Sequence, residues 1–348
     1  MVNKTMDALV KEKRGPGLTL MKVPIPSPQI GEVLIKVRKA AICGTDVHIY
    51  NWDEWSQQRI TPPVVIGHEY VGEIVELGEG VTGLSVGQRV SSESHVVCGR
   101  CRNCLAGNEQ WCEHTTIVGV NLNGAFAEYL CVPHVNVMPI PDDIPEDVVS
   151  FYDALGNATH TALMFDVRGE NVLVTGAGPI GLMAAKISKF CGARRVVITD
   201  LKDYRLDLAR RLGVDEAVNV GRESLEDAMR SVNIPGGFDV GMEMSGNTAG
   251  LAQLLGSLRN GGKAALLGIF SSGRSDMDWN DIIFKGLTVQ GITGRRMDNW
   301  SQMSALIQGG LDMLPVITHR YHYKDFEKGF AAMKSGESGK VVFDWMES

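Results

Sequence analysis

The chain has 348 residues, of which 44% are hydrophobic and 22% are charged, with 40 glycines. At roughly 150 residues per domain this length predicts two domains, and the composition excludes both a small single binding module and a disordered chain. A net charge of −7 argues against an electrostatic surface for nucleic acid or anionic membranes, so we expect neither as a partner.

The ends of the sequence and its cysteines bear on location. Residues 1–15 mix basic with polar residues and lack the apolar core of a secretory signal peptide, and no run of about 18 apolar residues is present to span a bilayer. The seven cysteines, an odd number, favour a reducing compartment in which clustered thiols bind metal rather than form disulfides. We therefore expect a cytoplasmic protein.

The first part of the chain, residues 32–136, reads as short β-rich segments separated by glycine and proline, for example 33–37 and 72–75. This pattern predicts a compact, irregular β domain. A stretch rich in proline and acidic residues at 139–146 interrupts the pattern and leads into a helix predicted over 148–165. We expect the junction between the two domains close to this stretch.

Strands and helices alternate beyond residue 170. The expected strands are 171–175, 195–199, 239–244, 263–267 and 287–291, and the first two expected helices are 179–191 and 204–213. Nearly continuous apolar strands separated by helices predict a parallel sheet covered on both faces, the doubly wound α/β class. The tail contains a further helix around 326–333 and a strand at 340–343, which the pattern assigns to neither domain.

A glycine-rich motif follows the first of these strands. Gly176, Gly178 and Gly181 form G-x-G-x-x-G between a predicted strand and a predicted helix, with Ile180 inside the motif. The first glycine allows the tight turn, the second admits a pyrophosphate to the backbone, and the third lets the helix pack on the strand. By itself the motif also fits an ordinary glycine turn.

An acidic residue decides in favour of a dinucleotide. Asp200 ends the second predicted strand, 19 residues after Gly181, where a carboxylate can accept hydrogen bonds from the adenosine ribose. The same charge repels a 2′-phosphate, so the sequence favours NAD over NADP. Arg205 leaves this choice partly open, because it could contact ribose, phosphate or only solvent.

Four cysteines lie within fifteen residues: Cys98, Cys101, Cys104 and Cys112. Four thiolates in one loop predict a closed, tetrahedral zinc site with a structural role, since no ligand position remains for a substrate. An iron–sulfur centre is the main alternative, and disulfide pairing is another.

A second group combines Cys43 with His68 and Glu69, a thiolate, an imidazole and a carboxylate from two segments. Three protein ligands with one open position would form a catalytic zinc site, which can bind a substrate hydroxyl and lower its pKa. Each of these residues alone also has an ordinary packing role, so residue types leave this site open.

These motifs occur in the order found in the zinc-dependent medium-chain dehydrogenases, which the chain resembles over essentially its whole length. The shared segments are Cys-Gly-Thr-Asp-x-His at 43–48, Gly-His-Glu at 67–69, the four-cysteine loop and the nucleotide motif. The resemblance implies a GroES-like catalytic domain from 1–156 and 297–348, a Rossmann domain from 157–296, and a homotetramer. It also implies two zinc ions per chain, a catalytic one at Cys43, His68 and Glu69 and a structural one at the four cysteines.

The resemblance further implies roles for single residues. Thr45 and His48 match a relay that passes the substrate proton by way of the cofactor ribose to solvent. Asp153 stands where relatives carry an acidic residue near the metal, often the longer Glu followed by proline, and we assign it a catalytic role rather than a ligand role. The expected cofactor contacts outside the glycine motif are Leu267, Gly268, Ile269, Ile292 and Thr293.

Segments 41–55 and 156–160 resemble the members of the family that oxidise the 3-hydroxyl of L-threonine. This implies that the metal lowers the pKa of that hydroxyl and that hydride passes to NAD, giving 2-amino-3-oxobutanoate and NADH. His95, Asp53 and Glu54 are candidates for recognising the ammonium and carboxylate of the substrate. Trp52 and Trp55 could form a lid over it, or could equally serve core packing or a subunit contact.

Two alternatives stay open. A polyol dehydrogenase, of the sorbitol type, would share every metal and cofactor residue and differ only around 52–55. A catalytically silent zinc and nucleotide-binding protein would keep the fold, but a complete set of ligand and relay residues argues against it.

Overall fold

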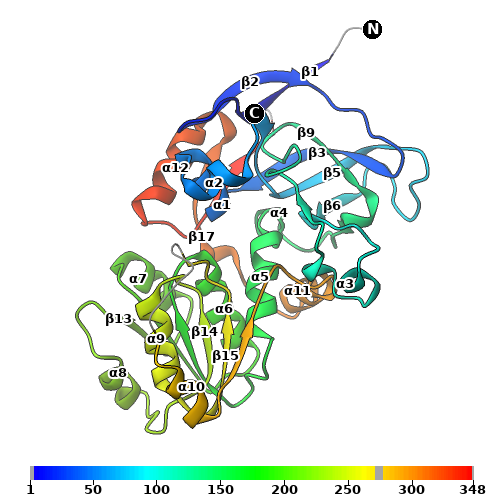
Figure 1. The fold of residues 1–348 in the computed structure, drawn as a ribbon. Coiled ribbons are helices and arrows are strands. Elements are labelled where there is room, and N and C mark those ends of the chain that lie inside the picture. Colours follow the sequence, from blue (N-terminus) through cyan, green and yellow to red (C-terminus); the bar gives the residue numbers. More distant parts are fainter. Residues whose placement is uncertain (1–3, 271–276, 347–348) are drawn as a thin grey trace.

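The computed structural model describes residues 4–270 and 277–346; the outermost residues of the expected domain spans, 1–3 and 347–348, lie outside the described part, as do 271–276. Figure 1 shows a sheet-rich block, built from the N-terminal half together with the end of the chain, above a second block of strands covered by helices. None of the described helices has the length and apolar character needed to cross a membrane.

The N-terminal half consists mainly of short strands, as its sequence pattern predicts. Its strands are β1 (Thr5–Lys11), β2 (Thr19–Pro24), β3 (Glu32–Ala41), β4 (Val64–Val65), β5 (Glu69–Leu77), β6 (Arg89–Ser92), β7 (His95–Val96), β8 (Thr116–Ile117), β9 (Tyr129–Pro133) and β10 (Val137–Pro139). Its helices are α1 (Gly44–Asn51), α2 (Glu54–Arg59) and α3 (Arg102–Leu105), with 3-10 turns at Glu109–Trp111 and His134–Asn136.

The end of the chain completes the largest sheet of this block. That sheet has the order β10-β6-β5-β3-β18-β17, and β9 also pairs with β3. Strands β17 (Ile317–His322) and β18 (Lys340–Asp344) run parallel to each other, and β18 lies antiparallel to β3 with Val342 opposite Ala41. The tail, which periodicity left unassigned, therefore lies beside the strand that precedes Cys43.

The second block contains the predicted parallel sheet. Its strands are β11 (Asn171–Thr175), β12 (Arg195–Asp200), β13 (Glu216–Asn219), β14 (Phe238–Glu243), β15 (Leu258–Leu266) and β16 (Thr288–Gly291), in the order β13-β12-β11-β14-β15-β16. Alternate side chains enter two separate cores: Val172 and Val174 pack on one face and Leu173 on the other. The doubly wound fold class is confirmed.

Helices cover both faces of this sheet and connect it to the first block. The helices on the sheet are α6 (Pro179–Phe190), α7 (Asp203–Arg211), α8 (Leu225–Ser231), α9 (Thr248–Ser257) and α10 (Trp279–Lys285). Helix α11 (Asp298–Gln308) packs on α5, and α12 (Phe326–Ser335) packs on β17 and β18 of the first block. Two 3-10 turns lie at Leu314–Val316 and Tyr323–Asp325. In Figure 1 the red α12 lies beside the blue α1, where Phe330 and Tyr50 stack with ring centroids 4.6 Å apart.

The helix predicted over 148–165 is in fact two helices, α4 (Glu146–Val149) and α5 (Tyr152–Ala162). Ser150 ends the first helix, with its hydroxyl donating to the carbonyl of Asp147 at 2.7 Å, and Phe151 leaves the helical backbone to enter the core. All residues of α5 except Asn157 are buried. Helix α5 packs on both β5 and α6, so it carries Asp153 into the seam between the blocks.

Candidate active site

The pairing of β3 with β5 brings three metal-binding side chains together. Ala41, at the end of β3, lies opposite Glu69, at the start of β5, which places Cys43 beside His68. The ligand atoms of Cys43, His68 and Glu69 all lie within 4.8 Å of one another. The structure thus assembles the group that residue types alone left open.

The donor set of this cluster fits a zinc ion. A thiolate, an imidazole and a carboxylate are all common zinc ligands. Glu69 is fully buried, and its Oε1 atom has no hydrogen-bond partner among the described residues. Since a buried carboxylate oxygen without a partner is costly, this atom is well suited to bind a cation.

Two buried charged residues that the sequence reasoning missed surround the cluster. Asp46 accepts a hydrogen bond from the backbone N–H of Cys43 at 2.9 Å, and its Oδ1 lies 3.8 Å from Nδ1 of His68. Lys340 of β18 forms an ion pair with Oε2 of Glu69 and donates to the carbonyl of Ile42 at 2.9 Å. Asp46 belongs to a motif already singled out, whereas nothing in the sequence marks Lys340.

The electrostatics of the cluster favour a cation. Burial lowers the pKa of His68, but the negative charges of Cys43 and Asp46 outweigh it, so the pKa is raised well above its ordinary value. For Glu69 burial dominates and raises the pKa, although Lys340 opposes this. Surroundings that retain a proton on a buried imidazole also attract a divalent cation in its place.

Helix α1 leads outward from the cluster and carries both expected relay residues. Thr45 lies in its first turn and is partly buried, while His48, one turn later, has 58% of its side chain exposed. Nδ1 of His48 pairs with the carboxylate of Asp53, which also caps α2. Asp53, a candidate for substrate recognition, thus has partners within the protein, whereas Glu54, in the first turn of α2, is exposed.

Asp153 lies near the cluster but is held by Arg295, whose side chain is fully buried. Arg295 also donates to Glu93 at 2.6 Å and to the backbone carbonyl of Asp153 at 2.9 Å. Glu93 in turn accepts from Nδ1 of His95 at 2.8 Å and from the indole of Trp300 at 3.2 Å. This network places Asp153 as an ion-pair partner of an arginine.

The arginine keeps two buried acids charged. Burial raises the pKa of Asp153 and of Glu93, but Arg295 and the neighbouring histidines together outweigh burial, so both pKa values are lowered. A Cβ atom at Gly156 would lie 2.3 Å from Cδ of Arg295, so only glycine leaves room for that side chain. Sequence reasoning missed Arg295 and Glu93. Gly156, a glycine inside a predicted helix, was the one sign in the sequence that another group packs closely there.

His95, another candidate for substrate recognition, lies at a cavity beside the four cysteines. This cavity has a volume of about 370 Å³, and Glu93, Arg295, Cys98 and Cys104 also line it. Trp52 and Trp55, for which the sequence left a lid, core packing or a subunit contact open, are partly buried and pack against the core of the first block.

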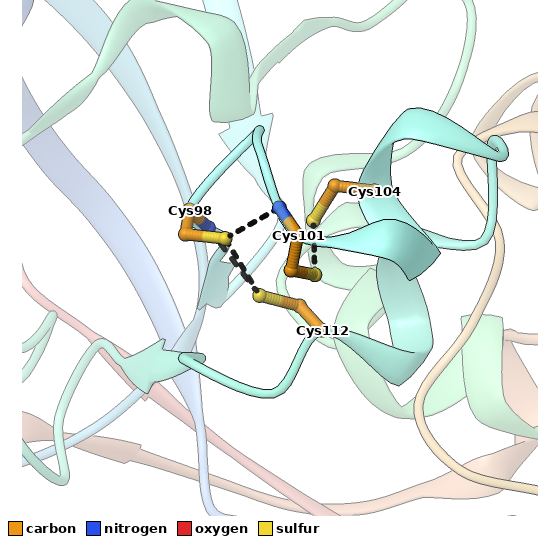
Figure 2. A group of neighbouring side chains, drawn as sticks. All are labelled: Cys98, Cys101, Cys104 and Cys112. Atoms are coloured by element: carbon orange, nitrogen blue, oxygen red, sulfur yellow. Dashed lines mark hydrogen bonds between the residues drawn. The ribbon is translucent and has the colours of Figure 1, made fainter.

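The segment from Cys98 to Cys112, here called the four-cysteine lobe, turns its four cysteine side chains toward one another, as in a metal-binding loop (Figure 2). Cys98, Cys101, Cys104 and Cys112 place their sulfurs within 4.8 Å of one another, and none of them forms a disulfide. Backbone N–H groups of Cys101 and Cys98 donate to the sulfurs of Cys98 and Cys112 at 3.3 and 3.4 Å. Such donors stabilise thiolates, and four thiolates fit a closed zinc site.

The nucleotide motif opens onto a cavity of about 520 Å³ lined by Gly176, Gly178, Asp200 and Arg205. Gly176 has φ +95°, and a Cβ atom there would lie 2.8 Å from the backbone of Ser245. The carboxylate of Asp200 accepts from the backbone N–H of Ala177 at 2.8 Å, which ties the second strand to the glycine turn.

The remaining expected cofactor residues lie near the carboxyl ends of the parallel strands. Gly181 is packed so closely that a Cβ atom would lie 2.0 Å from the carbonyl oxygen of Gly176, and Ile180 is partly buried in the first turn of α6. Segment 267–269 follows β15, with Ile269 83% exposed, and segment 292–293 follows β16. The carboxyl ends of parallel strands form the expected binding edge.

Comparisons with known proteins agree with this geometry. Residues 29–142 match the alcohol dehydrogenase GroES-like domain, and residues 179–309 match the zinc-binding dehydrogenase family. The chain is 57% identical over 341 residues to an L-threonine 3-dehydrogenase of Burkholderia thailandensis, covering 98% of this chain and 99% of the relative.

Solved structures share the fold over nearly the whole chain. A short chain alcohol dehydrogenase from Escherichia coli CFT073, complexed with NADH, has a TM-score of 0.90 at 28% identity and covers 98% of this chain and 99% of that one. A zinc-binding dehydrogenase from Sinorhizobium meliloti 1021, bound to NADP, has a TM-score of 0.90 at 26% identity, with the same coverage of 98% and 99%.

Proposed function

This chain belongs to the zinc-dependent medium-chain dehydrogenases, a family of oxidoreductases, and on that basis we propose that it oxidises the 3-hydroxyl of L-threonine to 2-amino-3-oxobutanoate with NAD as hydride acceptor. The observation that carries the proposal is the Cys43, His68 and Glu69 cluster in a chain 57% identical to an L-threonine 3-dehydrogenase.

Each group of the site then has a role. Cys43, His68 and Glu69 would hold a catalytic zinc, and the four cysteines of the lobe a structural one. When bound, the catalytic zinc polarises the substrate hydroxyl and the nicotinamide accepts the hydride. The glycine motif and Asp200 orient the cofactor, which supplies the alignment that hydride transfer needs.

The chain itself handles the proton. Thr45 accepts the proton of the substrate hydroxyl while giving up its own hydroxyl proton, which a ribose hydroxyl of the bound cofactor would pass on to His48. His48 lies one turn further along the same helix with its side chain exposed, so it can release a proton to solvent. Arg295 holds Asp153 ionised beside the site, so that a fixed negative charge faces the buried imidazole of His68.

NADH formation followed at its absorbance band tests this proposal. Purified, zinc-loaded protein is mixed with NAD and either L-threonine or sorbitol. Signal with threonine alone is the expected result. Signal with sorbitol alone would move the protein to the polyol-oxidising members of the family, and silence with both substrates in protein of confirmed zinc content would indicate a catalytically silent member.

We further propose that the chain divides into 1–156 with 297–348, and 157–296. Strands β11 to β16 all fall inside the second span, and β17 and β18 join the sheet of the first, which supports this division. The seven cysteines, none of them in a disulfide, support a cytoplasmic location.

A homotetramer is the proposed assembly. Within the described ranges no strand pairs with the outer side of β16, and the adjacent α10 exposes Trp279, Ile283 and Phe284 by 64, 66 and 81%. An open sheet edge beside exposed apolar side chains is a surface that another subunit would cover. The mass in solution, measured by light scattering, decides between this assembly and a monomer.

A further inference from the structure

The carboxylate of Asp53 is held from two sides. One oxygen pairs with Nδ1 of His48, and the other accepts from the backbone N–H and the hydroxyl of Ser56 at 3.0 and 3.1 Å. Both members of the pair remain partly exposed, with 38% of the Asp53 side chain and 58% of the His48 side chain open to solvent. A histidine that exchanges protons with solvent needs this kind of access.

An unusual backbone turn brings Asp53 back to His48. Trp52, the residue after α1, has the left-handed conformation with φ 58° and ψ 45°, and its N–H donates to the carbonyl of His48 at 2.9 Å. A bulky residue rarely adopts this conformation, and surrounding contacts must hold it there. The turn reverses the chain, so Asp53 lies against the helix that it follows.

Buried contacts hold this turn in place. Lys11, only 1% exposed, donates to the carbonyls of Gly15 and Gly17 at 2.5 and 2.9 Å, and its ammonium lies 5.1 Å from the ring centroid of Trp52. The N–H of Gly17 donates in turn to the carbonyl of Tyr50 at 2.7 Å. The Lys11 ammonium over the Trp52 ring and the hydrogen bond from Gly17 to Tyr50 thus stabilise a backbone turn that is unfavourable on its own.

We propose that Asp53 is a positioning residue for proton transfer, acting through His48. The carboxylate accepts the Nδ1–H of the imidazole and thereby leaves Nε2 as the nitrogen that takes up the proton. The imidazolium formed is paired with the Asp53 anion, and the Nε2 proton then passes to water, which restores the starting tautomer. This proposal rests on the relay role of His48 in the proposed function.

A matched substitution separates this role from helix capping. Asparagine caps a helix about as well as aspartate, so Asp53→Asn keeps an oxygen for the Ser56 N–H. The amide it turns toward His48 is a donor, and it no longer accepts the Nδ1–H. Asp278, which caps α10 by accepting from the N–H of Asn280 at 2.9 Å, gives the control substitution Asp278→Asn.

The test measures kcat for threonine and KM for NAD in the zinc-loaded proteins. We expect Asp53→Asn to lower kcat about tenfold or more with KM for NAD changed by less than about twofold, and Asp278→Asn to leave both unchanged. In a His48→Gln background, Asp53→Asn should add less than a further twofold loss. An unchanged kcat in Asp53→Asn, or an equal loss in both backgrounds, would overturn the proposal.

A second readout needs no turnover. In protein labelled with nitrogen-15 at histidine, in mildly alkaline buffer, the His48 signal is assigned from the spectrum of His48→Gln. We expect Nδ1 to be protonated in the wild type and to lose that proton to Nε2 in Asp53→Asn; a wild-type signal with Nδ1 bare would refute the pairing. If this readout succeeds while threonine gives no NADH, the pairing stands and the proposed substrate fails.

Discussion

At Gly156 a single missing side chain makes room for a buried charge. The position lies inside the buried helix α5, where alanine would ordinarily be preferred over glycine by about 1 kcal/mol. Here a Cβ atom would lie 2.3 Å from Cδ of Arg295, the residue that pairs with Asp153 and Glu93. The glycine is therefore tied to the charge network beside the site.

Replacement of this glycine should reverse the usual preference. We expect Gly156→Ala to lower the free energy of unfolding by roughly 1–3 kcal/mol, because the methyl group forces Arg295 off its two carboxylates. Gly256 in α9 is the control, since the nearest atom to its added Cβ lies at 4.0 Å, and Gly256→Ala should be neutral or stabilising. Urea unfolding of the zinc-loaded proteins measures both. Equal effects at the two positions would show that Arg295 adapts freely.

The short helix α4 shows how one carboxylate can connect three elements. Asp147 of α4 pairs with Lys39 of β3 and with Arg320 of β17, the latter at 2.7 Å. Burial raises the pKa of Asp147, but the two cations outweigh it and lower the pKa below the ordinary value of 3.8. The helix that leads into the seam is thereby tied to the sheet of the first block.

The contribution of this carboxylate should depend on pH. Its pKa is lower in the folded than in the unfolded chain, so its stabilisation is complete above about pH 4 and disappears as the pH falls through the folded value. At neutral pH we expect Asp147→Asn to be less stable than the wild type by roughly 1–2 kcal/mol. Urea unfolding across the acid range should show the gap closing below pH 4. A gap that persists there would assign the effect to packing.

The sequence predicted the parts of this molecule whose partners lie close along the chain. The cysteine lobe, the glycine motif with Asp200 and the main strands follow from local spacing and alternation. The charged residues around the metal cluster were not predictable, because Lys340 lies 271 positions from Glu69 and Arg295 lies 142 positions from Asp153. The fold alone brings such residues together, and their spacing carries no signal.

At the scale of the whole molecule, the candidate metal cluster and the nucleotide motif lie in different blocks. The sheet-rich block carries Cys43, His68 and Glu69, the parallel sheet carries the glycine motif and Asp200, and α5 lies in the seam between them. A change confined to the first block should therefore affect turnover without affecting the affinity for the dinucleotide.

The most direct test measures turnover and NADH binding side by side in the wild type and in Cys43→Ser. Loss of the thiolate removes one of three ligands from the candidate catalytic site, while the nucleotide cavity stays intact. We predict that NADH formation from threonine falls by about a thousandfold or more, whereas the Kd for NADH, measured by fluorescence, changes by less than about twofold. Retained turnover in Cys43→Ser, or a parallel loss of NADH binding, would contradict this division of roles.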